Sequence, residues 1–267
     1  MFKKIMIAVC MAAISAAAGA QEIKITGSTT LLPVAQKTAE IFMKKNPGIR
    51  ITVGGGGSGV GIASLVDGTC DIANSSRAMK SKERQSALSR KVNPKANVVA
   101  LDAIALVVNS SNRIEGLTRQ QVKDIYSGKI SNWSQVGGNN LRIVVVSRDS
   151  ASGTFEAFNE LALGGARVRK DALMQASNQA VATIVSQAPG AIGYVGLGYI
   201  SGSVRAVPVG GVKPSRKTVL SKSYGYSRSL FMYTNGEPRG AVKKYIDFVT
   251  GKEGQKIVEE VGFVGID

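Results

Sequence analysis

Three junctions of one kind constrain what this chain can fold into. Each joins a predicted strand to a predicted helix through a turn rich in glycine and hydroxyl residues, at residues 27–30, 54–61 and 148–154. Strand-like residues precede these turns, and apolar residues at helical spacing follow them. A helix start offers unpaired N–H groups and the positive end of the peptide dipoles. The repeated pattern therefore favours the binding of an anion.

The third junction carries the strongest signal. Arg148 supplies a permanent, fork-shaped cation that suits oxyanions, and the turn after it holds three hydroxyl side chains and a glycine. The alternative is structural, with Ser152 capping the helix and Arg148 pointing into water. Because the chain repeats the arrangement twice more, the functional interpretation is favoured.

The other two junctions also allow structural interpretations. At 27–30 we expect Ser28 or Thr29 to cap the following helix, as these residue types often do. At 54–61 the glycines let the backbone approach a ligand closely, and Ser58 adds a donor. A flexible linker is the alternative, but a predicted strand precedes these glycines and a predicted helix follows them. The loop is not a Walker loop, because no Lys-Ser/Thr pair follows it.

The first twenty residues have the organisation of a secretory signal. Lys3 and Lys4 precede an apolar run at 5–14, and small residues end in Ala18-Gly19-Ala20. We therefore expect residues 1–20 to be a cleaved signal peptide and the mature protein to lie in the periplasm. The alternative is a permanently inserted helix, for which the apolar run is short.

Composition excludes several classes of function. The formal charge of +16 falls to +14 when the two signal lysines are removed, but the cations are dispersed and aromatic residues are few. We therefore expect no nucleic-acid partner. The absence of histidine excludes Ser-His-Asp and Cys-His hydrolysis and most zinc sites. We expect no metal and no cofactor.

The two cysteines give little further constraint. Cys10 lies inside the signal, with no cysteine at the predicted cleavage point, so we expect no lipid anchor. Cys70 is then alone, and no intramolecular disulfide can form. We interpret it as a small buried apolar residue, with a reactive exported thiol as the alternative.

The apolar pattern also predicts where the chain passes between two domains. The run 98–108 is too long for one ordinary strand, which places a first crossover near residue 105. The run 230–233 is apolar enough to carry the chain back. Lobe 1 is therefore predicted at 21–105 plus 230–267, and lobe 2 at 106–229. We also expect an exposed helix at 80–91, a capped helix at 117–128, surface strands or loops at 201–223 and a helix pair at 240–260.

Taken together, these motifs give the chain a family resemblance. Six segments follow one another as in the short form of the periplasmic phosphate-binding proteins that serve ABC transporters, which the chain resembles. They are the turn at 27–30, the loop at 57–59 and the segments 71–77, 117–133, 148–154 and 190–194. The resemblance implies a two-lobed α/β fold of the type II periplasmic-binding-protein kind, with two interdomain crossovers. It implies a non-enzymatic monomer that binds inorganic phosphate between the lobes and delivers it to an inner-membrane ABC permease, without being embedded in the membrane itself.

The resemblance also implies a set of phosphate-binding residues. Both lobes contribute to it: Thr29, Thr30, Ser58, Gly59, Ser76, Arg77, Arg148, Ser152, Gly153 and Thr154. Ser76 stands where many family members have an aspartate that accepts the proton of phosphate, and Arg77 beside it could add a second cation. Ser150 matches a second aspartate that often pairs with the site arginine, with Asp149 next to it.

Three other functions remain as alternatives. The chain could bind another tetrahedral oxyanion, such as sulfate, molybdate or arsenate, because a serine selects for a bound proton less strongly than an aspartate. It could be an exported adhesion or sensing member of the family, given its positive charge. A phosphatase-like enzyme would need a carboxylate–metal site, and the acidic residues are scattered away from the three turns.

Overall fold

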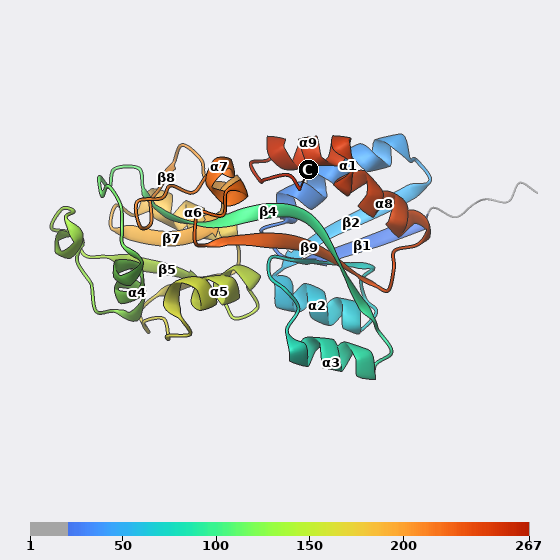
Figure 1. The fold of residues 1–267 in the computed structure, drawn as a ribbon, viewed down its shortest axis with the longest axis horizontal. Helices are drawn as coiled ribbons and strands as arrows, with labels where there is room; N and C mark the ends of the chain where they lie inside the picture. The colour runs from blue at the N-terminus through green and yellow to red at the C-terminus, as the bar shows by residue number, and fades with distance from the viewer. Residues whose placement is uncertain (1–20, 267) are drawn as a thin grey trace, which may run out of the picture.

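The computed structural model describes residues 21–266, so the predicted signal peptide lies outside the described residues. The described chain forms the expected two-lobed α/β fold, with its strands in one continuous hydrogen-bonded path, β2-β1-β3-β9-β4-β7-β5-β6, and β8 beside β4. Figure 1 shows the two lobes side by side, with β4 and β9 running from one into the other.

Lobe 1 is a five-stranded sheet covered on both faces. Its strands are β1 (Gln21–Gly27), β2 (Ile49–Gly56), β3 (Ile72–Ser75) and the outer halves of β4 (Pro94–Asn109) and β9 (Ser227–Asn235). Three helices, α1 (Leu32–Lys45), α8 (Gly240–Thr250) and α9 (Lys252–Glu260), cover one face, and α2 (Ser58–Val66) and α3 (Ser81–Ser89) lie on the other (Figure 1). The main core lies under α1, α8 and α9.

Lobe 2 is built around β7 (Ala191–Gly196) and the inner half of β4. The strands β5 (Val144–Arg148), β6 (Leu173–Gln175) and β8 (Val204–Ala206) complete its sheet. Its helical segments are α4 (Arg119–Ser127), η1 (Trp133–Val136), α5 (Gly153–Phe158), η2 (Asn159–Leu163), α6 (Asn178–Gln187), η3 (Leu197–Tyr199) and α7 (Arg216–Leu220). Trp133, Phe158 and Tyr194 are buried in its larger core.

Both passages between the lobes are strands. From Pro94 to Ala103, β4 pairs with β9, and from Ile104 to Val108 it pairs antiparallel with β7. The run 98–108 is thus part of one 16-residue strand that serves both sheets. We call β4 and β9 together the crossing ribbon. The lobe boundaries near residues 105 and 230 remain a prediction. Close to the first boundary, β4 changes its pairing partner from β9 to β7, between Ala103 and Ile104.

Helix ends follow local chemistry, with two corrections to the sequence analysis. The expected helix at 117–128 begins at the Thr118 cap and ends at Gly128 in the left-handed conformation. The expectation that Ser28 or Thr29 caps α1 is wrong, because the cap position is Leu31 and no side chain caps it. The segment 201–223 was expected to hold strands or loops only, but it also contains α7.

Candidate functional site

The three junctions meet where the lobes face each other. Thr30 Oγ1 of the first junction lies 2.9 Å from Thr154 Oγ1 of the third. The backbone N–H of Gly59 in the second junction donates to the carbonyl of Ala151 over 3.0 Å. All the predicted side chains at this meeting point are buried: Thr29, Thr30, Ser58, Ser76, Arg148, Ser152 and Thr154. We call this group, with Asn178, the cleft floor.

Arg148 is the cation of the cleft floor, at the end of β5. Its side chain is buried, with Nε donating to the carbonyl of Gln175 and Nη2 to that of Ala176, both over 2.9 Å. Within residues 21–266, its Nη1 has no hydrogen-bond partner. Burial lowers the pKa of this guanidinium from its ordinary value, and the nearby Asp149 opposes that shift. Since arginine stays protonated in proteins, the site holds a buried positive charge whose two Nη1 N–H groups are unused by the described residues.

A second buried arginine, Arg228, was missed by the sequence analysis. It lies on β9 directly opposite Asp102 of β4. Its Nε and Nη2 donate to Asp102 Oδ2 over 3.0 and 2.8 Å, and Nη1 donates to the carbonyl of Ser76 over 3.2 Å. Burial raises the pKa of the Asp102 carboxyl, and the positive charge of Arg228 opposes this. The only signal in the sequence was a single aspartate within an apolar run.

Asn178, the first residue of α6, was also missed. Its Nδ2 donates to Thr29 Oγ1 and to Thr30 Oγ1, each over 3.1 Å, and its Oδ1 accepts from the N–H of Gly196 over 3.1 Å. The side chain is fully buried and joins lobe 2 to lobe 1. Because asparagine is common at helix starts, its position in the sequence indicated only a helix boundary.

The glycines of the second and third junctions permit close approach between the lobes. Gly57 has a φ of +98°, and a Cβ there would lie 2.5 Å from the carbonyl oxygen of Ala151. A Cβ on Gly153 would lie 2.2 Å from Ser58 Oγ and 2.9 Å from Ser76 Oγ. The two serines are themselves in contact, with their Oγ atoms 3.3 Å apart. A side chain at either glycine would therefore keep the junctions apart.

At the third junction, Ser152 behaves as the structural interpretation expects, whereas Arg148 does not. Ser152 Oγ accepts from the N–H of Phe155 over 3.2 Å, so it caps α5 as the structural alternative expects. Arg148, in contrast, does not point into water, because only 1% of it is exposed.

Arg77 lies next to the cleft floor, but its guanidinium faces elsewhere. Its Nη1 and Nη2 donate to the two carboxylate oxygens of Glu83 over 2.8 and 2.7 Å, and its Nε pairs with Glu156 of α5. Lys80 pairs with the same Glu156 over 2.9 Å. We call Arg77, Lys80, Glu83 and Glu156 the cleft rim. The charge of Arg77 is matched by carboxylates there, which does not support its expected role as a second cation for the ligand.

The acidic side chain closest in sequence to Arg148 serves the turn. Asp149 Oδ1 accepts from the N–H of Ala151 over 2.9 Å, which fixes the backbone before Ser152. Ser150 lines a depression of about 640 Å³ beside the cleft rim. The carboxylate next to Ser150, that of Asp149, is therefore used for turn geometry.

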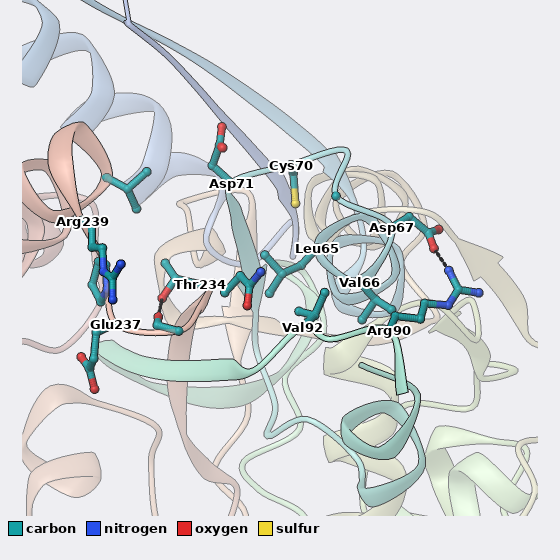
Figure 2. Close-up of a pocket in the computed structure, with 15 residues that line it drawn as sticks. Leu65, Val66, Asp67, Cys70, Asp71, Arg90, Val92, Thr234, Glu237 and Arg239 are labelled. Atoms are coloured by element: carbon teal, nitrogen blue, oxygen red, sulfur yellow. Dashed lines mark hydrogen bonds and ion pairs between the residues drawn. The ribbon is translucent and has the colours of Figure 1, made fainter. Parts of the chain in front are cut away.

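A larger depression lies on the far side of lobe 1. It has a volume of about 680 Å³ and is bordered by Asp67, Cys70, Arg90, Glu237 and Arg239 (Figure 2). Asp67 and Arg90 form an ion pair across one end of it. Cys70 lines it and is buried, and burial raises the pKa of its thiol to about 11, which favours the interpretation as an inert side chain. Among the described residues, the unpartnered buried polar atoms do not belong to this depression.

Two further features of the described chain concern membranes and metals. Between residues 21 and 266, no helix is long and apolar enough to cross a membrane. No cluster of three or more acidic or cysteine side chains suited to a metal ion occurs there either.

Comparison with known proteins identifies the family. The profile of the PBP superfamily domain matches residues 12–253. The chain is 33% identical to the phosphate-binding protein PstS of Bacillus subtilis, over 91% of this chain and 80% of that protein. It is also 33% identical to the PstS of Borreliella burgdorferi, over 91% of this chain and 90% of the relative.

Solved structures agree with the sequence comparisons. A Clostridium perfringens protein with bound phosphate, provisionally named as a substrate-binding protein of a phosphate ABC transporter, has a TM-score of 0.86 at 35% identity, covering 92% of this chain and all of that one. An ABC-type phosphate transport receptor from Vibrio cholerae has a TM-score of 0.75 at 31% identity, covering 91% of this chain and 99% of that chain. The chain therefore belongs to the PBP superfamily and, within it, to the family of phosphate-binding proteins.

Proposed function

We propose that this protein binds inorganic phosphate on the cleft floor and delivers it to an inner-membrane ABC permease. The observation that carries the proposal is the buried guanidinium of Arg148, whose Nη1 has no acceptor within residues 21–266. Burying a charge without a counter-ion is costly, and an anion bound at this point removes that cost. Hydroxyl groups of the first and third junctions lie near this guanidinium: Thr29 Oγ1 is 3.3 Å from its Nη2, and Thr30 Oγ1 is 2.9 Å from Thr154 Oγ1. Such groups can donate to a small oxyanion.

The site draws its donors from both lobes. Thr29, Thr30 and Ser58 belong to lobe 1, and Arg148 and Thr154 to lobe 2. An anion held by all of them joins the lobes, so phosphate should favour the closed arrangement over an open one. The names of the relatives support phosphate over other tetrahedral oxyanions, and they do not favour an adhesion or sensing role.

The remaining parts of the proposal concern the setting. The protein acts as a monomer in the periplasm, after cleavage of residues 1–20, and it makes and breaks no covalent bond. The relatives that it matches are named as binding proteins and transport receptors, which supports a carrier.

Isothermal titration of the purified protein tests the proposal. We expect saturable, one-to-one binding of phosphate. Arsenate, which resembles phosphate in shape and protonation, should compete with it. Saturable binding of sulfate or molybdate with no response to phosphate would reverse the choice of ligand, and no response to any of the four anions would exclude an oxyanion carrier.

A further inference from the structure

The orientation of the Asn178 amide is fixed by its surroundings. The backbone N–H of Gly196, which can only donate, lies 3.1 Å from one end of the amide. That end must be the oxygen, and Nδ2 must therefore face the two threonines. Nδ2 has two protons, and one lies toward each of Thr29 Oγ1 and Thr30 Oγ1 at 3.1 Å.

This orientation determines the proton of the Thr29 hydroxyl. A hydroxyl oxygen has two lone pairs and one proton. Thr29 Oγ1 accepts from Nδ2 of Asn178 and from Nη2 of Arg148, the latter over 3.3 Å. Both lone pairs then face N–H donors, so the hydroxyl can only donate its own proton, and a bound anion would be the acceptor.

Thr30 is held in the same way. Its Oγ1 accepts from Nδ2 of Asn178 and from Nη2 of Arg228, the latter over 3.4 Å. Its own proton points to Thr154 Oγ1, 2.9 Å away, or to the anion. If Thr154 accepts it, the Thr154 hydroxyl is left to donate in turn. The floor therefore directs protons into the cleft along either route.

We propose that Asn178 is a positioning residue that sets the direction of these hydroxyl protons, so that the cleft selects its ligand by negative charge rather than by a proton on the ligand. This inference rests on the proposed function. It fits the residue at position 76, which is a serine and not a carboxylate that could accept a proton from the ligand. The other charged groups facing the threonines are Arg148, Arg228 and, paired with the latter, Asp102.

The test compares two dianions of similar shape: monohydrogen phosphate, which has an O–H group, and monofluorophosphate, which has a fluorine in its place. Displacement of labelled phosphate is measured at a pH where phosphate is the dianion. We expect the wild-type protein to bind the two within about tenfold of each other, because donors facing the ligand need no proton from it. Wild-type binding of phosphate without fluorophosphate would overturn the inference, whereas binding of neither would instead overturn the proposed function.

The variant Asn178→Asp should reverse the preference. A carboxylate of the same shape accepts from both hydroxyls, whose lone pairs then face the cleft. The added negative charge weakens both dianions alike, but only phosphate can donate a proton to the reversed hydroxyls. We expect the ratio of phosphate to fluorophosphate affinity to rise about tenfold or more. An unchanged ratio in a folded variant would refute the role of Asn178.

Two other variants control for lost contacts between the lobes. In the wild type, the Tyr199 hydroxyl donates to the backbone carbonyl of Thr29 over 2.5 Å. Tyr199→Phe removes this hydrogen bond and leaves the threonine hydroxyls unaffected. It should weaken both anions equally and leave the ratio at the wild-type value. Asn178→Ala frees one lone pair on each threonine and should raise the ratio a few-fold. Equal ratios for these two variants would show that Asn178 only bridges the lobes.

Discussion

The cleft floor and the cleft rim hold their cations in opposite ways. On the floor, the Arg148 guanidinium donates to two backbone carbonyls and to a threonine, and no ion pair joins it to a carboxylate within residues 21–266. On the rim, Arg77 contacts the carboxylates of both Glu83 and Glu156. Both arginines are nine-tenths buried or more.

The difference separates two tasks of the cleft. A carboxylate pair satisfies a cation permanently, so the rim can hold α5 of lobe 2 against the start of α3 without any ligand. Carbonyl oxygens position a guanidinium but do not neutralise it, so the charge of Arg148 stays available to an anion. Under the proposed function, the floor therefore decides which anion binds, and the rim contributes to how firmly the lobes close.

The largest effect is expected from removing the floor cation. Arg148→Met keeps most of the side-chain length and removes the charge together with the unused Nη1. Hydrogen bonds to charged groups contribute about 1.5–3 kcal/mol each, so phosphate affinity should fall at least on the order of 100-fold. Titration calorimetry measures the loss. Near wild-type affinity would show that the anion lies elsewhere.

A smaller loss is expected from separating the junctions. The Cβ of Gly153→Ala would lie 2.2 Å from Ser58 Oγ, so the lobes should not close fully. Overpacking typically costs about 1–3 kcal/mol, which predicts a roughly 10- to 100-fold weaker affinity for phosphate.

The matched control for this prediction is Gly48→Ala. No atom lies within 4 Å of the position that its Cβ would occupy. Phosphate binding by this variant should stay within about twofold of the wild type. If both variants bind equally well, close approach of the junctions is not needed for binding.

The rim should respond more weakly. Glu156→Gln removes the charge that joins lobe 2 to Arg77 and Lys80, while Arg77 keeps its contacts with Glu83. We expect about a fivefold faster release of phosphate in stopped-flow measurements, because a partly exposed pair contributes about 1 kcal/mol. Glu160→Gln, beside the same depression, is the control and should leave the release rate unchanged. A loss as large as that of Arg148→Met would place the rim in the binding site.

The smallest effect concerns the stability of the rim in acid. Burial pushes the pKa of Glu83 upward, but the hydrogen bond from Arg77 and that from the Lys80 N–H leave it below the ordinary value of 4.5. A lowered pKa stabilises the fold above the unfolded-state value and is lost as the pH falls through the folded-state value. Glu83→Gln should therefore lose less unfolding free energy below pH 4.5 than the wild type in denaturant titrations. If the unfolding free energies of the variant and the wild type fall equally below pH 4.5, this prediction is wrong.

Local patterns in the sequence predicted the three junctions, and the resemblance supplied most of the cleft floor. Each junction combines a strand, a turn and a helix within a few residues, so spacing and residue type suffice to find it. Local patterns do not predict contacts between residues that lie far apart in the chain. The partner of Arg77 in lobe 2 is 79 positions away (156 − 77), and the partner of Arg228 on β4 is 126 away.

The missed residues follow from the same cause. Asp102 lay in an apolar run that was interpreted only as a crossover, although a buried carboxylate needs a cation nearby. Asn178 was interpreted as part of a helix, because its acceptors belong to the first junction, 148 and 149 positions earlier. The predicted cap at Ser28 or Thr29 was wrong because α1 begins later, at Leu32. The side chains of Thr29 and Thr30 are therefore available to the cleft floor.

The sheet of lobe 1 has an implication for how the chain acquires its structure. Its strand order places β9 between β3 and β4, so the strand that joins the two parts is made after both of them. Until Asn235 has emerged from the ribosome, β3 and β4 present open edges with no partner between them. Lobe 2, predicted at 106–229, is one continuous stretch and can assemble earlier. Lobe 2 should therefore fold before lobe 1, whose two parts are joined only when β9 pairs with β3 and β4.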